Sequence, residues 1–80
     1  MKQNEAECLV KELMESELTI KAELHTYKNR ANELNPDCYV KIESKGLIIK
    51  QSAMLNIIYV LKEYGYGFAI DFKYNCLVVD

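Results

Sequence analysis

Few residues of this sequence could bind a metal or form a disulfide. Cys8, Cys38 and Cys76 are odd in number and widely separated, no C-x-x-C pair is present, and His25 is the single histidine. A disulfide framework needs paired cysteines in an oxidising compartment, and a zinc site needs a recognisable ligand set. We therefore expect three small, buried or half-buried apolar cysteines, with no metal and no cofactor.

Catalytic motifs are also missing from the sequence. It contains no G-x-G-x-x-G stretch and no phosphate-binding P-loop, and His25 has no acid or nucleophile at helical spacing. Glu43 and Asp71 fall on a surface that we expect to be open, so they would act as paired carboxylates only if a partner covered them. The sequence thus predicts a protein that is not an enzyme.

Tyrosine is the residue type that is over-represented. Six of the 80 residues are tyrosine, against two phenylalanines and no tryptophan. Four of them are predicted at the surface or in turns, namely Tyr39, Tyr59, Tyr66 and Tyr74. Such amphipathic rings are enriched at protein interfaces, although tyrosine also favours strands and tolerates exposure. Both interpretations remain open at this point.

The element expected to position the rest of the chain is a helix over residues 4–34. This stretch has no Gly or Pro and a single polar break at Ser16 and Glu17, and apolar residues recur every seven positions at Leu13, Ile20, Tyr27 and Leu34. Asn4 is the predicted N-cap, with Glu7 three residues on, and Asn35-Pro36 is the predicted end. The pattern predicts one long amphipathic helix.

Such a helix would be longer than the sheet it covers. Its length would be roughly 45 Å, whereas strands of five or six residues span only about 17–20 Å. An overhanging apolar stripe must be buried against another surface, and its near-heptad spacing favours a second copy of the chain. We therefore expect a homodimer. The predicted dimerisation residues are Leu9, Val10, Leu13 and Ile20.

Residues 38–80 predict a ββαββ unit. Residues 38–44 alternate, with Val40 and Ile42 inward, and Lys45-Gly46 is a predicted two-residue turn that pairs Ile42 with Ile49 and points Ile48 outward. A second helix is expected over residues 53–64, capped by Ser52 and ended by Gly65. The second hairpin joins 68–73 to 76–79 through Tyr74-Asn75, pairing Phe72 with Leu77 and Ile70 with Val79.

These elements predict a single domain, residues 1–80, of the α+β class with the order αββαββ. Its four-stranded antiparallel sheet carries both helices on one face and leaves the other face open. That open face mixes aromatic, aliphatic and charged side chains, as interfaces of transient complexes do. The predicted partner-binding residues on it are Tyr39, Lys41, Ile48, Lys50 and Val78.

Charge and segment composition limit the function further. The formal net charge of −2 is far from the strong positive field of a dedicated nucleic-acid binder. No signal peptide or membrane-spanning stretch is recognisable, so we expect a cytoplasmic protein. The favoured function is a small interaction module that acts by binding an unidentified protein partner, with inhibition of that partner as one outcome, as small phage-encoded accessory proteins do. The alternatives are RNA or DNA binding on the open sheet face and a small nucleotide-like ligand at a dimer seam.

Overall fold

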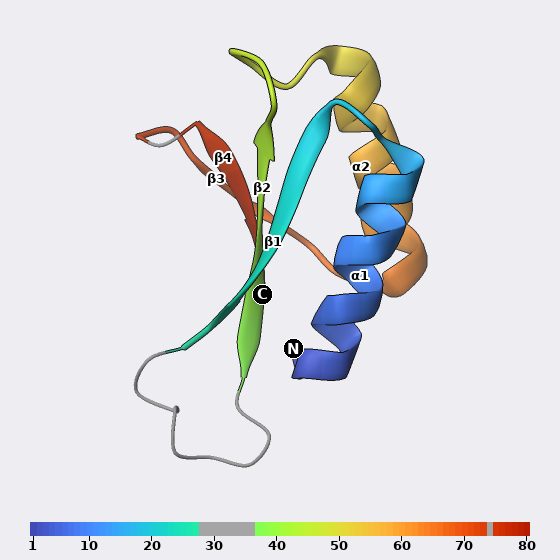
Figure 1. Cartoon of the computed structure of the whole chain (residues 1–80), viewed down its shortest axis with the longest axis vertical. Helices are drawn as coiled ribbons and strands as arrows, with labels where there is room; N and C mark the ends of the chain where they lie inside the picture. The colour runs from blue at the N-terminus through green and yellow to red at the C-terminus, as the bar shows by residue number, and fades with distance from the viewer. Residues whose placement is uncertain (28–36, 74) are drawn as a thin grey trace.

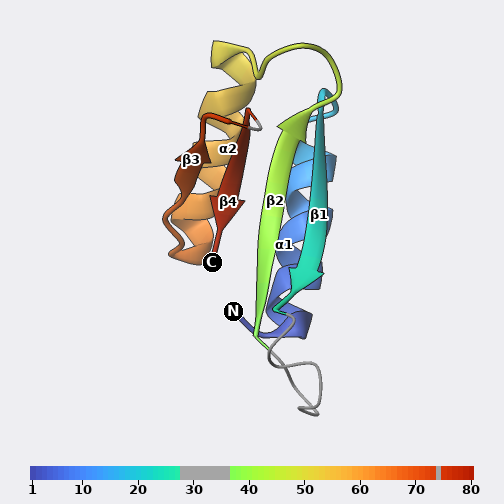
Figure 2. The same ribbon diagram turned by 90° about the vertical axis from the view of Figure 1, so that its left-hand side faces the viewer.

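The computed structural model describes residues 1–27, 37–73 and 75–80, and it arranges them in two layers (Figure 1). The elements in chain order are α1 (Gln3–Ser16), β1 (Ile20–Thr26), β2 (Cys38–Ser44), α2 (Gln51–Tyr64), β3 (Ala69–Asp71) and β4 (Cys76–Val79). The four strands form one antiparallel sheet, in the order β1-β2-β4-β3. Both helices lie behind it in Figure 2. The predicted α+β class and αββαββ order are therefore confirmed.

The predicted helix over residues 4–34 is wrong, because α1 has 14 residues and ends at Ser16. Lys2 is its N-cap in place of Asn4, and Ala6, Leu9 and Leu13 are its buried residues. The chain turns extended at Glu17, whose backbone N–H still donates to Leu13 O at 3.0 Å. The polar break in the apolar stripe is thus the helix end. The predicted helix residues 28–34 and the predicted turn at Asn35-Pro36 lie outside the described residues.

The Glu17 carboxylate helps to hold this helix end in place. It accepts hydrogen bonds from the Thr19 backbone N–H at 3.2 Å and from Asn56 Nδ2 at 2.8 Å, so it ties the α1–β1 connection to α2. Hydrogen bonds from Thr19 first, and then from Asn56, lower the pKa of Glu17 because they stabilise its charged form.

Residues 20–26 form a strand because their sequence also satisfies a period of two. Ile20 and Ala22 are buried and Leu24 is partly buried, while Lys21 and His25 lie on the other face. Ile20 fits both the seven-residue repeat of a helix and the alternation of a strand. The seven-residue repeat therefore could not distinguish a helix from a strand over residues 20–26. As a strand, β1 pairs with β2, and Ala22 lies opposite Ile42.

The predicted first hairpin is consequently wrong in its second strand. Ile42 pairs with Ala22 and Leu77 instead of Ile49, and residues 47–50 belong to no strand. Leu47, which alternation with an outward Ile48 would turn toward the core, is 93% exposed. Because β1 and β4 occupy the two edges of β2, no edge is left for residues 47–50 to pair with.

The α2 helix agrees closely with the prediction. It begins at Gln51 after an N-cap at Lys50 that makes no side-chain capping bond, so Ser52 is not the cap. It ends at Gly65, whose φ of 79° is the left-handed conformation that favours glycine at a helix end. Its buried residues are Ala53, Ile57, Val60 and Leu61. The Tyr66 hydroxyl donates to the Glu5 carboxylate and so links this end of α2 to α1.

The second hairpin has the predicted faces and a shifted register. Ile70 pairs with Leu77, two residues from the predicted Val79, and β3 keeps only three residues. A shift of two preserves which side chains share a face, because side chains alternate with period two. Asn75 has a φ of 54°, a left-handed conformation that asparagine adopts more readily than most residues.

Two leucines that are close in sequence are expected to contribute very differently to the stability of the fold, because only one of them is buried. Leu13 is fully buried between α1 and the sheet, whereas Leu18 is 75% exposed. We expect Leu13→Ala to lower the free energy of unfolding by about 2–5 kcal/mol, through lost burial and a cavity, and the same change at Leu18 to alter it by less than about 0.5 kcal/mol. Urea unfolding followed by circular dichroism measures both. Equal midpoints for the two variants would contradict the burial of Leu13.

Candidate protein-interaction surface

The sheet face opposite the helices, here called the open sheet face, is built from alternate residues of all four strands. Pairing between strands sets neighbours across it: Lys21 lies opposite Glu43, Glu23 opposite Lys41, and His25 opposite Tyr39. Lys41 and Ala69 both lie opposite Val78, and Asp71 lies opposite Cys76. Because β1 is a strand, this face gains Lys21, Glu23 and His25.

Charges of opposite sign alternate over the β1–β2 part of this face. Along β1, Lys21 Nζ lies 2.7 Å from Glu23 Oε1, and His25 Nε2 lies 3.4 Å from Glu23 Oε2. The hydrogen bond and charge of Lys21, and to a lesser extent those of His25, lower the pKa of Glu23, while Glu23 raises the pKa of Lys21. Such solvated pairs add little stability. Their value is a defined pattern of charge that a partner surface can match.

An aromatic cluster, made of His25, Tyr27 and Tyr39, lies at one end of the open sheet face. The His25 and Tyr39 rings are stacked, with centroids 5.1 Å apart and an interplanar angle of 12°. The Tyr27 ring is tilted by 48° against Tyr39, at a centroid distance of 5.0 Å. A hydrogen bond to the Asp80 carboxylate raises the pKa of Tyr27, because it favours the neutral phenol. The three rings therefore contact one another, and Tyr27 also contacts Asp80.

The aromatic cluster borders a shallow hollow. The hollow has a volume of about 410 Å³, and it is lined by His25, Thr26, Tyr27, Tyr39 and Val78. The three ring residues and Val78 are each only partly exposed, so they are supported from below and still reachable from solvent. Rigid aromatic side chains beside a concave surface are the usual centres of protein interfaces.

The buried thiol of Cys76 lies on the same face, farther from the aromatic cluster. Burial raises the pKa of Cys76; Lys41 opposes this rise, and the charges of Asp71 and Glu43 add to it. A raised pKa keeps the group as a thiol at neutral pH, so it lacks the thiolate needed for nucleophilic chemistry. Within the described residues, no three or more His, Cys, Asp or Glu side chains are grouped to hold a metal ion.

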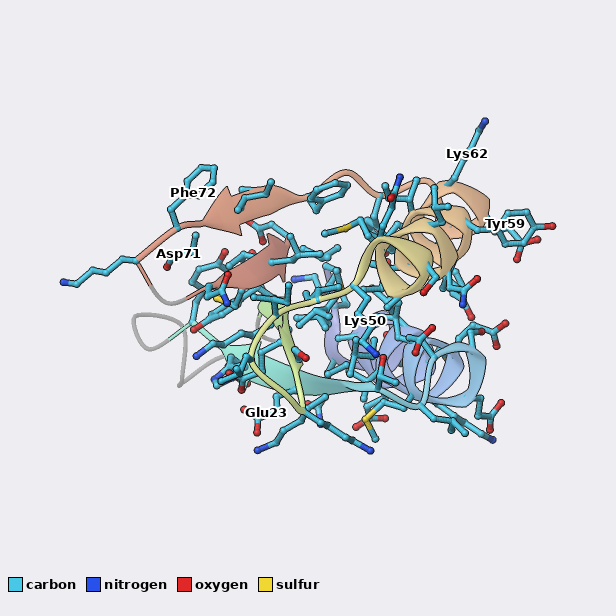
Figure 3. The ribbon with its side chains drawn as sticks, turned by 90° about the horizontal axis from the view of Figure 1, so that it is seen from above. Glu23, Lys50, Tyr59, Lys62, Asp71 and Phe72 are labelled. Carbon is cyan, nitrogen blue, oxygen red and sulfur yellow. The ribbon has the colours of Figure 1, made fainter. Side chains whose placement is uncertain are left out.

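Three of the five predicted partner-binding residues come together in the structure. Tyr39, Lys41 and Val78 lie on the open sheet face. Ile48 and Lys50 do not, because their predicted strand is absent: both lie in the connection between β2 and α2, beside a separate hollow of about 570 Å³. Lys50 appears there in Figure 3, next to the start of α2.

The sequence interpretation missed Glu23, His25 and Tyr27 as members of this face. A helix was predicted over all three, so their contact with Tyr39 could not be inferred. The alternation of Ile20, Ala22 and Leu24 with polar residues was the available signal.

The predicted dimerisation stripe is used inside the monomer. Leu9, Leu13 and Ile20 are fully buried in the core of this chain, and Val10 packs partly buried against it. The prediction depended on an overhanging helix, and the shorter α1 has no such overhang. A dimer through these side chains would require unfolding the monomer core.

Comparison of the chain with protein-family models, curated protein sequences and solved structures gave no match. Among the described residues, no helix has both the length and the apolar character needed to cross a membrane. Function is therefore inferred from the geometry of the open sheet face.

The burial of the thiols leads to a test of this face. Of the three free cysteines, Cys8 is exposed, while Cys38 and Cys76 are buried. We expect Ellman's reagent to label one thiol quickly in the folded protein, none in Cys8→Ser, and all three of the wild type in urea. Any fast-reacting thiol in folded Cys8→Ser would show that the structure around Cys38 or Cys76 opens readily.

Proposed function

We propose that this chain is a non-enzymatic cytoplasmic interaction module that binds a protein partner through its open sheet face. The observation that supports this most strongly is the stacked His25–Tyr39 pair, with Tyr27 against it, beside a hollow on a strand-built surface. Binding that blocks a working surface of the partner would inhibit it without any chemistry on this chain.

The aromatic cluster would form the centre of the interface. Ordered rings lose little conformational entropy on binding, because neighbouring side chains already restrict them, and they bury a large area. Val78 extends the apolar part of the contact across β4. In known protein interfaces, the largest losses of binding energy come from truncating such central aromatic residues.

The alternating charges would supply specificity around that centre. Lys21, Glu23, Lys41 and Glu43 form a two-by-two block in which each charge has opposite neighbours along and across the strands. A partner needs the inverse pattern in register, since a shift by one position would place like charges together.

The same block favours a protein over a nucleic acid. Phosphate-driven binding requires a surplus of Lys and Arg, whereas Glu23, Glu43 and Asp71 share this face with Lys21 and Lys41. Stacking of bases on Tyr39 would be opposed by repulsion between these carboxylates and the phosphates. We therefore rank RNA or DNA binding second.

A matched pair of tyrosine variants tests the proposed function. Wild-type protein is immobilised to capture a partner from the source cells, and the purified partner is titrated by calorimetry. We expect Tyr39→Ala to weaken binding by at least about 1–2 kcal/mol, or about 5- to 30-fold in Kd. Tyr59→Ala, a truncation on the far side of α2 where the ring points away from the sheet (Figure 3), should leave Kd unchanged. If both variants weaken binding equally, or if only Tyr59→Ala does, the partner does not bind through the open sheet face.

A fluorescence anisotropy titration with mixed oligonucleotides at low salt tests the second-ranked function. We expect no saturable binding by the wild type. Binding that weakens steeply with added salt, and that is reduced by Lys41→Ala, would reverse the ranking of protein and nucleic acid.

A further inference from the structure

A second surface lies at the β3 edge of the sheet. The strand order β1-β2-β4-β3 leaves β3 with a neighbour on one side only. Three apolar residues alternate on the same side of this edge: Phe68, Ile70 and Phe72 are 39%, 50% and 86% exposed. In Figure 3, β3 forms one end of the sheet and Phe72 projects away from the body of the molecule. A soluble protein rarely leaves such a run of large apolar residues uncovered.

The α2 helix extends this apolar edge. Phe68 shares a hollow of about 580 Å³ with Ile58 of α2, and Ile70 shares one of about 120 Å³ with Met54. Leu55 is three residues before Ile58, on the same side of the helix, and it is 61% exposed. We define the β3-edge surface as Leu55, Ile58, Phe68, Ile70 and Phe72. It is separate from the open sheet face, because Phe68, Ile70 and Phe72 alternate with the outward-facing Ala69 and Asp71.

We propose that a second copy of the chain covers the β3-edge surface by antiparallel pairing of the two β3 strands. A two-fold axis through Ile70 would join the two sheets into one of eight strands, with both α2 helices on the same side. A two-fold interface uses one patch twice, so the patch must complement itself.

The order of residues along β3 selects the register. Pairing centred on Ile70 places Phe68 opposite the partner's Phe72 on the apolar side, and Asp71 opposite the partner's Ala69 on the open sheet face. Aromatic pairs directly across strands are favourable. Centring on Asp71 would preserve the faces as well, but it would set two Asp71 carboxylates opposite each other. Centring on Ala69 would set Asp71 opposite the partner's Gly67 and leave Phe72 without Phe68 or Ile70 across from it. Only the Ile70-centred register pairs Phe68, Ile70 and Phe72 with one another, so it is the favoured one.

The exposed area is sufficient for a dimer. From their exposed fractions, the five side chains present roughly 400–500 Å² of apolar surface per copy. Two copies would bury roughly 800–1,000 Å² through these side chains, and the paired β3 backbone would bring the total to the size at which specific interfaces begin. With only three residues in β3, side-chain burial would supply most of the stabilisation, and the backbone bonds would set the register.

This proposal does not rest on the partner-binding function. The open sheet face would stay accessible in the dimer, since the axis adds the second sheet beside the first. A dimer would carry two aromatic clusters on one continuous surface.

Engineered cysteines test the register. In a Cys8→Ser background, Ile70→Cys would place two thiols directly opposite each other, at a Cα separation of about 4.5–5.5 Å that suits a disulfide. The matched control is Phe72→Cys, which is more exposed but would lie four residues, or about 13 Å, from its symmetry mate. We expect mild oxidation to give covalent dimer for Ile70→Cys, at least about tenfold faster than for Phe72→Cys. Equal or faster crosslinking of Phe72→Cys would mean random collision and would overturn the pairing.

Sedimentation equilibrium tests the surface without new thiols. We expect the wild type to be a dimer at micromolar concentration, and Phe72→Asp to be a monomer with an unchanged circular dichroism spectrum. Leu18→Asp, another exposed apolar residue changed in the same way, should remain a dimer. A monomeric wild type, or a dimer that Phe72→Asp leaves intact, would overturn the proposal whether or not a protein partner is found.

Discussion

The fold depends on the pairing of β2 along both of its edges. Cys38, Val40 and Ile42 of this strand are fully buried by the helices, so its backbone polar groups have no access to water on that side. Buried backbone groups must be hydrogen-bonded, which here requires a strand on each edge. Residues 20–26 supply one and β4 supplies the other. The short α1 and the turn at Glu17 follow from this requirement, since β1 must reverse direction to reach β2.

The same pairing creates the candidate site. Once β1 lies beside β2, the alternation that buries Ile20 and Ala22 must point Glu23 and His25 to the opposite face. His25 then stacks on Tyr39 because the register sets them directly across from each other. Neither ring would be so restrained alone. The ordering of the aromatic cluster is thus a consequence of strand register, as is the alternation of charges beside it.

The two proposed contacts use different physical properties of one sheet. The open sheet face offers side chains held in fixed positions over paired strands, which suits recognition of a specific protein. The β3 edge has a neighbouring strand on one side only and carries exposed apolar side chains, which suits pairing with an identical edge. Because a strand's face and its edge point in perpendicular directions, both contacts can be occupied together.

Local sequence determined the features that depend on neighbouring residues: the alternation of β2, the stop of α2 at Gly65, the positive φ of Asn75, and the α+β class. The presence of Tyr39, Lys41 and Val78 on one face also followed from alternation. Only the tertiary structure decided that Ile20–Thr26 is a strand, since its pattern fits both a helix and a strand and β2 needed a partner there. Because residues 20–26 pair with β2, Leu9, Leu13 and Ile20 are buried within one chain. The same pairing leaves Ile48 and Lys50 outside the sheet and sets His25 opposite Tyr39. Contacts between residues so far apart depend on pairing between strands, and the spacing of residues within one segment carries no information about them.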